Sequence, residues 1–78
     1  MSEEQKKNIK EKNKKIYKRL HIARHTAEKT FDEIAEDMGV TTSTIFQKFK
    51  NLKNGKSVKT EFLFEMEKYF GIKIFFEL

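Results

Sequence analysis

The chain has 78 residues, a net charge of +5 at pH 7 and no cysteine. This length predicts one domain with a small core that a second copy would help to stabilise, and the lack of cysteine excludes disulfides and thiolate metal sites. No apolar run approaches the roughly 20 residues that span a bilayer, and the charged N-terminus lacks the apolar region of a secretory signal. We therefore expect a cytoplasmic protein with no membrane contact, no metal and no other cofactor.

The first 29 residues combine a basic segment with a helical pattern. Residues 1–14 are polar and rich in lysine, which predicts a basic, flexible N-terminal arm. A first helix should follow and end near residues 27–29. His21 and His25 are spaced i, i+4 on it, and we interpret them as a surface pair because no third metal ligand accompanies them. The apolar residues at helical spacing are Ile16, Leu20, Ala23 and Ala27.

The middle of the chain predicts two short helices joined by a tight turn. Thr30 and Glu33 form the Ser/Thr-x-x-Glu pattern of a capping box, which starts a second helix. Gly39 supplies the left-handed backbone that ends it. Thr41 is a good N-cap for a third helix over about residues 42–52. A helix, a glycine turn and a second helix together predict a helix-turn-helix.

The expected third helix has two unlike faces. Ile45, Phe49 and Leu52 form one apolar stripe. The other face carries hydroxyls, an amide, an aromatic ring and a cation, and such side chains can reach base edges or phosphates from a helix in a groove. The candidate base contacts are Thr42, Ser43, Phe46 and Gln47. The candidate phosphate contacts are Thr30, Thr41, Lys48, Lys50, Lys53 and Lys56.

The charges are distributed in blocks. Residues 1–29 hold ten basic and four acidic residues, and residues 30–47 hold four acidic residues and no basic one. Residues 48–60 hold five lysines and no acidic residue. A basic block directly after the polar-faced helix fits a surface that follows phosphates. Lysines that only keep a small protein soluble are the alternative interpretation.

The last third of the chain predicts a helix followed by a strand. Ser57 or Thr60 should cap a fourth helix, which Gly71 ends. Residues 72–78 alternate at period 2, which is typical of a strand, and a lone strand needs a partner. We expect pairing with the same strand of a second copy, with an extended tail lying on the helices as the alternative. The candidate dimer residues are Ile72, Ile74, Phe76 and Leu78.

The predicted fold is therefore mainly α. It is a four- to five-helix bundle with a helix-turn-helix in residues 15–71, plus a short C-terminal β-strand over residues 72–78 that serves dimerisation. No glycine-rich phosphate loop and no supported Ser/His/Asp arrangement is present, so we expect no enzyme.

Short motifs follow one another in a particular order and spacing: Arg24, Ile34-Ala35, Met38-Gly39-Val40-Thr41, Ser43-Thr44-Ile45 and Phe70-Gly71-Ile72. Together they resemble the Cro/C1-type (lambdoid repressor, XRE-like) helix-turn-helix family. The resemblance implies a small phage or bacterial transcriptional repressor that binds double-stranded DNA at a palindromic operator as a homodimer, with Gln47 reading bases. Phe31 stands where the family usually has a glutamine that clamps a phosphate. Phe49 stands where it often has a glutamate that pairs with the arginine.

Two other functions compete with this interpretation. The first is a helix-turn-helix protein repurposed for protein binding, such as a phage-encoded inhibitor or antirepressor, with Phe31, Phe46 and the acidic second helix as its contact surface. A patch of these two rings away from the lysines would favour it. The second is an RNA-binding module that stacks bases on the aromatic rings. Phe46 itself could contact thymine methyl groups, pack on another protein or fold back onto Phe31.

Overall fold

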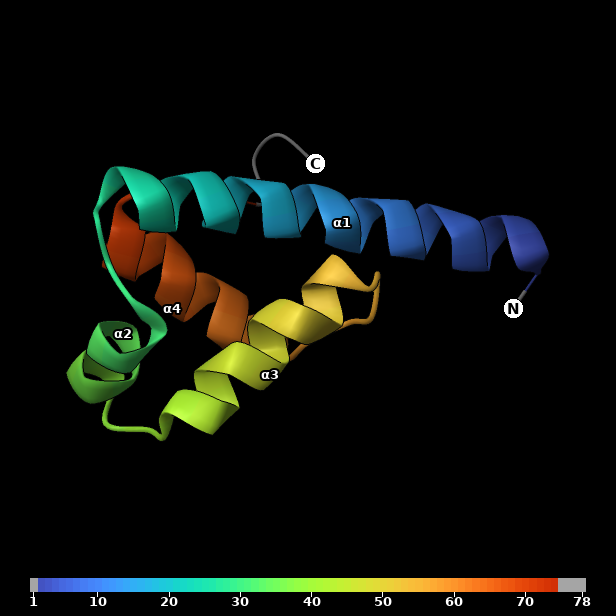
Figure 1. Ribbon diagram of the computed structural model, residues 1–78. Coiled ribbons are helices and arrows are strands. Elements are labelled where there is room, and N and C mark those ends of the chain that lie inside the picture. Colours follow the sequence, from blue (N-terminus) through green and yellow to red (C-terminus); the bar gives the residue numbers. More distant parts are fainter. Residues whose placement is uncertain (1, 75–78) are drawn as a thin grey trace.

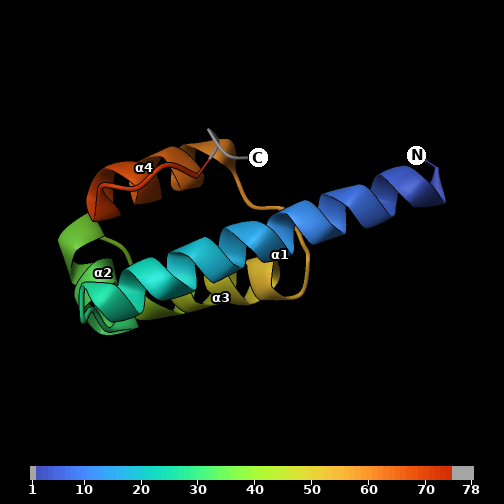
Figure 2. The same ribbon diagram turned by 90° about the horizontal axis from the view of Figure 1, so that it is seen from above.

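Four helices surround one apolar core in a computed structural model, which describes residues 2–74. They are α1 (Glu3–Thr26), α2 (Phe31–Met38), α3 (Thr42–Lys53) and α4 (Thr60–Phe70). The long α1 packs against both α3 and α4, and α2 packs against α3 (Figure 1). Seen from above, α3 and α4 lie on different sides of α1 (Figure 2). The predicted helical bundle is confirmed.

The core is built from the apolar stripes of all four helices and from the segment after α4. Three residues of α3 that were predicted to face inward, Ile45, Phe49 and Leu52, are buried. Phe49 lies at the centre of an aromatic group, with its ring 6.3 Å from that of Phe62 in an edge-to-face arrangement. The remaining buried apolar residues are Ile16, Leu20, Ile34, Ala35, Phe62, Leu63, Met66 and Ile74.

The boundaries of α2 and α3 follow the local signals in the sequence. The hydroxyl oxygen of Thr30 accepts a hydrogen bond from the Glu33 N–H at 3.1 Å, and the Glu33 carboxylate accepts one from the Thr30 N–H at 3.3 Å. Gly39 ends α2 with a φ of 69°, a backbone conformation that favours glycine. The Thr41 hydroxyl accepts a hydrogen bond from the Thr44 N–H at 3.2 Å. The predicted capping box, glycine stop and N-cap are all confirmed.

The N-terminal segment differs from its prediction. Residues 3–14 are helical and continue into α1 without a break, whereas a flexible arm was expected. A second capping box explains the early start, because Ser2 accepts from the Gln5 N–H at 3.2 Å and Gln5 accepts from the Ser2 N–H at 3.1 Å. Glu3 and Glu4 also suit the positive end of the helix dipole. Side chains 2–12 are all exposed, and this part of α1 extends beyond the other helices (Figures 1 and 2).

One buried amide fixes α1 to the loop between α3 and α4. Asn13 is 7% exposed, and among residues 2–74 it is the one polar residue that is buried. Its Nδ2 donates to the carbonyl oxygen of Gly55 and to the hydroxyl of Ser57, both at 3.1 Å. The Lys10 side chain also lies against Gly55, so this part of α1 is held to the loop by one aliphatic contact and by the two N–H bonds of Asn13.

We expect Asn13→Ala to destabilise the domain by about 1–3 kcal/mol, because the carbonyl of Gly55 would stay part-buried without its donor. Asn8→Ala is the matched control, since Asn8 lies on the same helix but is exposed. Urea unfolding followed by helical circular dichroism measures both. Equal shifts of the unfolding midpoint for the two variants would contradict a role for the Asn13 hydrogen bonds.

The predicted C-terminal strand is not present in the described residues. Residues 72–74 follow α4 as irregular chain, and the N–H of Ile74 donates to the Glu67 carboxylate at 2.7 Å rather than to another strand. Ile74 is fully buried in the core of its own chain and Ile72 packs partly against it, while the role of both residues in a dimer stays a prediction. Phe76 and Leu78 lie outside the described residues.

A side-chain contact joins the C-terminal ends of α2 and α4. The hydroxyl of Tyr69 donates a hydrogen bond to the Asp37 carboxylate, and Lys29 Nζ lies 3.6 Å from the same group. The bond from Tyr69 lowers the pKa of Asp37, while burial together with this bond raises the pKa of Tyr69 to about 12. Asp37 is thereby held toward α4 and Lys29.

Candidate nucleic-acid interface

The outer face of α3 is polar and carries no negative charge. α3 contains no acidic residue, and its N-cap Thr41 follows directly on the turn that ends α2. Ser43, Gln47 and Lys50 are exposed, while the opposite side of the helix is in the core. A helix with one anchored face and one uncharged or cationic face can approach the acceptor-rich edges and phosphates of a nucleic-acid groove without like-charge repulsion.

Three of the four hydroxyls predicted to contact DNA, those of Thr30, Thr41 and Thr42, already have partners within the protein. Thr42 Oγ1 donates to the Asp32 carboxylate at 2.6 Å, and the hydroxyls of Thr41 and Thr44 lie 2.9 Å apart. The Thr30 hydroxyl is part of the capping box with Glu33. Because Asp32 and Glu33 place two negative charges in the first turn of α2, this end of the helix is an unfavourable position for a phosphate.

The amide of Gln47 lies on the exposed face of α3, one turn before Asn51. Its Nε2 donates to the Asn51 Oδ1 at 3.0 Å. This i, i+4 bond holds the Gln47 side chain along the helix surface. An amide in this position keeps its oxygen and a second N–H for other partners, which is the donor and acceptor pair that recognises adenine.

The lysines predicted to contact phosphates lie on two flanks of α3. Lys50 and Lys53 line a cavity on the side of α1. Lys48 lies on the side of α4, with its Nζ 5.0 Å from the centre of the Phe62 ring. Lys56 follows α3 in the loop and is exposed. The two lysine flanks lie on either side of the face that carries Gln47.

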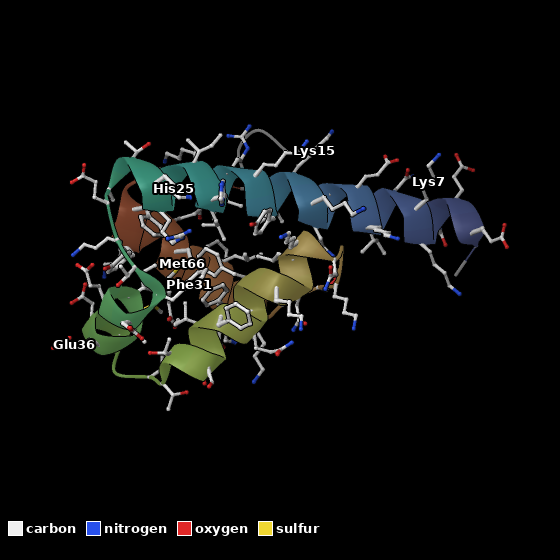
Figure 3. All side chains as sticks on the ribbon, in the orientation of Figure 1. Lys7, Lys15, His25, Phe31, Glu36 and Met66 are labelled. Carbon is white, nitrogen blue, oxygen red and sulfur yellow. The ribbon has the colours of Figure 1, made fainter. Side chains whose placement is uncertain are left out.

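A cavity of about 350 Å³ lies where α1, the start of α2 and α3 meet. The Phe31 ring is half-buried and meets the rings of Phe46 and Phe49 edge-on, at 5.8 and 5.1 Å. Phe46 is 51% exposed. In Figure 3, Phe31 points inward toward α1 and α3, whereas Glu36 points outward from the other side of α2. The cavity residues are Tyr17, Arg24, Phe31, Phe46, Phe49, Lys50, Lys53 and Asn54.

Arg24 contacts an aromatic ring and a backbone carbonyl, instead of the glutamate that often pairs with this arginine in the Cro/C1-type family. Its guanidinium lies over the Phe31 ring, 4.5 Å from the centroid, and Nη1 donates to the carbonyl oxygen of Lys29 at 3.1 Å. Its Nε is buried without a hydrogen-bond partner among residues 2–74. The phenylalanines that depart from the family pattern therefore form a cation–π and aromatic cluster around this arginine.

Sequence reasoning missed this cavity, although part of its signal was present. Tyr17, His21 and Arg24 are spaced i, i+4 and i+7, which puts them on one side of α1. The Tyr17 and His21 rings are stacked 5.6 Å apart, and the His21 and His25 rings are 4.4 Å apart. The spacing alone does not tell which helix packs against this side of α1. Only the folded structure shows that it is α3.

The described part of the chain has neither a metal-ligating cluster nor a helix that could span a membrane. Residues 2–74 contain no group of three histidine, aspartate or glutamate side chains placed to hold a metal ion. Within the same range, every helix is too short or too polar to serve as a bilayer span.

The chain matches no family model, no curated protein and no solved structure. The functional conclusion is therefore drawn from the chain's own residues and their geometry.

Proposed function

We propose that this chain is a sequence-specific DNA-binding protein that inserts α3 into the major groove. The observation that carries the proposal is the outer face of α3, where a presented amide lies between two flanks of lysines and no acidic residue interrupts them. Gln47 would read a base, with Ser43 and Thr42 beside it, and Lys50 and Lys53 would contact phosphates. Lys48 and Lys56 would extend the phosphate contacts along the groove.

The position of the aromatic rings supports DNA over a protein partner. A protein-binding function would be favoured by an aromatic patch away from the lysines. Phe31 packs against the core, and Phe46 lines the same cavity as Lys50 and Lys53. An exposed ring surrounded by cations suits a polyanion better than an apolar protein surface. The second candidate function is that of a phage-encoded inhibitor that binds another protein. The exposed acidic residues of α2 are the observation that favours it.

The proposal includes a homodimer acting as a repressor on a palindromic operator, as the family resemblance implies. Two copies of α3 would read half-sites about one helical turn, roughly 34 Å, apart. Since Ile74 packs in the core of its own chain, the proposed dimer contact through the C-terminal segment would rest mainly on the other candidate residues there.

The first experiment is selection of bound DNA from a random duplex library by the purified protein, at about physiological salt. Gln47→Ala is then expected to weaken binding to the selected site by roughly 1–3 kcal/mol and to relax the preference at one base position. Lys50→Ala should weaken selected and random DNA by similar factors, because a phosphate contact carries no sequence information.

Fluorescence anisotropy with one selected and one random duplex measures these differences. If Gln47→Ala weakens both duplexes equally, Gln47 reads no base. If the selection enriches no sequence, the protein is not a sequence-specific DNA-binding protein.

A further inference from the structure

The cavity between α1 and α3 combines an apolar interior with a cationic rim. The rings of Phe31, Phe46 and Phe49 form one wall, and Tyr17 lies on the α1 side. No acidic residue lines the cavity. Its volume of about 350 Å³ is at the lower end of the roughly 300–1,000 Å³ typical of ligand pockets. A ligand of one or two rings matches this size.

The three cations around the cavity have no carboxylate partner. Lys50 and Lys53 form no ion pair within the described chain, and the contacts of Arg24 are a carbonyl, His25 and the Phe31 ring. The same positive charge acts on His21, whose pKa is lowered by desolvation and then by His25, Arg24 and Lys53. Positive charge is therefore concentrated here without internal compensation, which favours a bound anion.

We propose that this cavity binds a small planar aromatic anion, a one- or two-ring carboxylate or phosphate, with its ring against Phe46 and Phe31 and its charge toward Lys50 and Lys53. Aromatic rings in edge-to-face groups accept a further ring at their open side, and lysines at the rim supply the counter-charge. The half-exposed ring of Phe46 would be covered by such a ligand.

The site also has a regulatory consequence, which rests on the proposed function. Phe46 and Lys50 belong both to this cavity and to the proposed DNA-binding face. A ligand that engages both would compete with DNA for α3, so that one small molecule would release the protein from its operator. Binding of the anion to free protein does not depend on this consequence and is tested separately.

The binding test uses 2-naphthoate as the probe, followed by NMR of the full-length protein. We expect saturable shifts of the aromatic resonances of Tyr17, Phe31 and Phe46. Phe46→Ala and Lys53→Met should each weaken binding about ten-fold, since each removes one of the two recognition elements. Phe64→Ala and Lys68→Met are the matched controls, because Phe64 is 56% exposed and both residues line a different cavity on α4.

Two further probes separate the parts of the recognition. Inorganic phosphate should leave the Phe46 resonances unchanged, and 2-naphthalenemethanol, which has the ring without the charge, should bind at least about ten-fold more weakly than 2-naphthoate. Equal affinity for the neutral and the anionic probe would overturn the role of the lysines. Unsaturable shifts, or equal weakening by the control variants, would overturn the site itself.

The competition test adds 2-naphthoate to the complex of protein and labelled DNA, with acetate at the same concentration as the ionic control. Release of DNA by naphthoate, beyond that by acetate, supports the regulatory consequence. Retention of DNA on naphthoate-saturated protein would overturn that consequence while leaving the site intact. A protein that binds naphthoate but no DNA at all would overturn the proposed function and its regulation together.

Discussion

The DNA affinity of this protein is expected to fall about 500-fold between 50 and 200 mM salt, which corresponds to a slope of log K against log salt near −4.5. The estimate assumes that about five phosphates are neutralised, each contributing about −0.9 to the slope. The cations come from the two flanks of α3 and the loop that follows, where residues 48–60 hold five lysines and no acid.

Charge variants test this expectation. The double variant Lys50→Gln with Lys53→Gln should make the slope shallower by about 2, because two phosphate contacts are lost. Lys68→Gln removes the same kind of charge from the last turn of α4 and should leave the slope unchanged. A slope shallower than about −1 for the native protein would exclude an electrostatic footprint on DNA.

Phe49→Ala should cost about 3–5 kcal/mol of folding free energy, because the ring is buried and its removal leaves a cavity. Phe49 is 2% exposed and packs edge-on against Phe31 and Phe62, so it joins α2, α3 and α4. A chain of this length has a total stability of only about 4–12 kcal/mol. We therefore expect a large loss of folded protein near body temperature.

Phe46→Ala is the matched control for this second prediction. Phe46 is the same residue type on the same helix, but about half of its surface is exposed. Its truncation should cost at most about 1 kcal/mol, since little buried surface is lost. Urea unfolding compares the two variants. If both cost the same, Phe49 does not occupy the centre of the core.

Local signals predicted the boundaries of α2 and α3 well, because the interactions that set them span only a few residues. Thr30 with Glu33, Gly39 and Thr41 each act within one helical turn. The predicted cap of α4 at Ser57 or Thr60 is wrong, since Lys59 is its N-cap residue and no side chain caps the helix. The early start of α1 was missed although Ser2 and Gln5 form the same kind of pattern. A charged segment with Ile9 as its one apolar residue after Met1 was interpreted as an arm, since composition alone does not distinguish a solvated helix from flexible chain.

The C-terminal segment and the cavity could not be predicted from local sequence patterns, for a different reason. An alternating pattern is common to a strand and to an extended segment that covers a core. Ile74 covers the core and does not pair in a strand, because its side chain is buried and its N–H donates to the Glu67 carboxylate. The cavity depends on Arg24 of α1 and Phe46 of α3 lining the same space, although the whole of α2 separates them in the sequence. The packing of the whole chain decides which residues of different helices come together.

The projecting part of α1 is a basic segment whose length would increase if the helix unwound. The side chains of residues 3–12 are all exposed, although Lys10 lies against Gly55, and the hydrogen bonds of Asn13 fix the helix to the loop. These ten residues measure about 15 Å as a helix and roughly 33 Å when extended. Unwinding would cost few tertiary contacts, so under the proposed function the lysines of this segment would reach phosphates beyond the span of the folded domain.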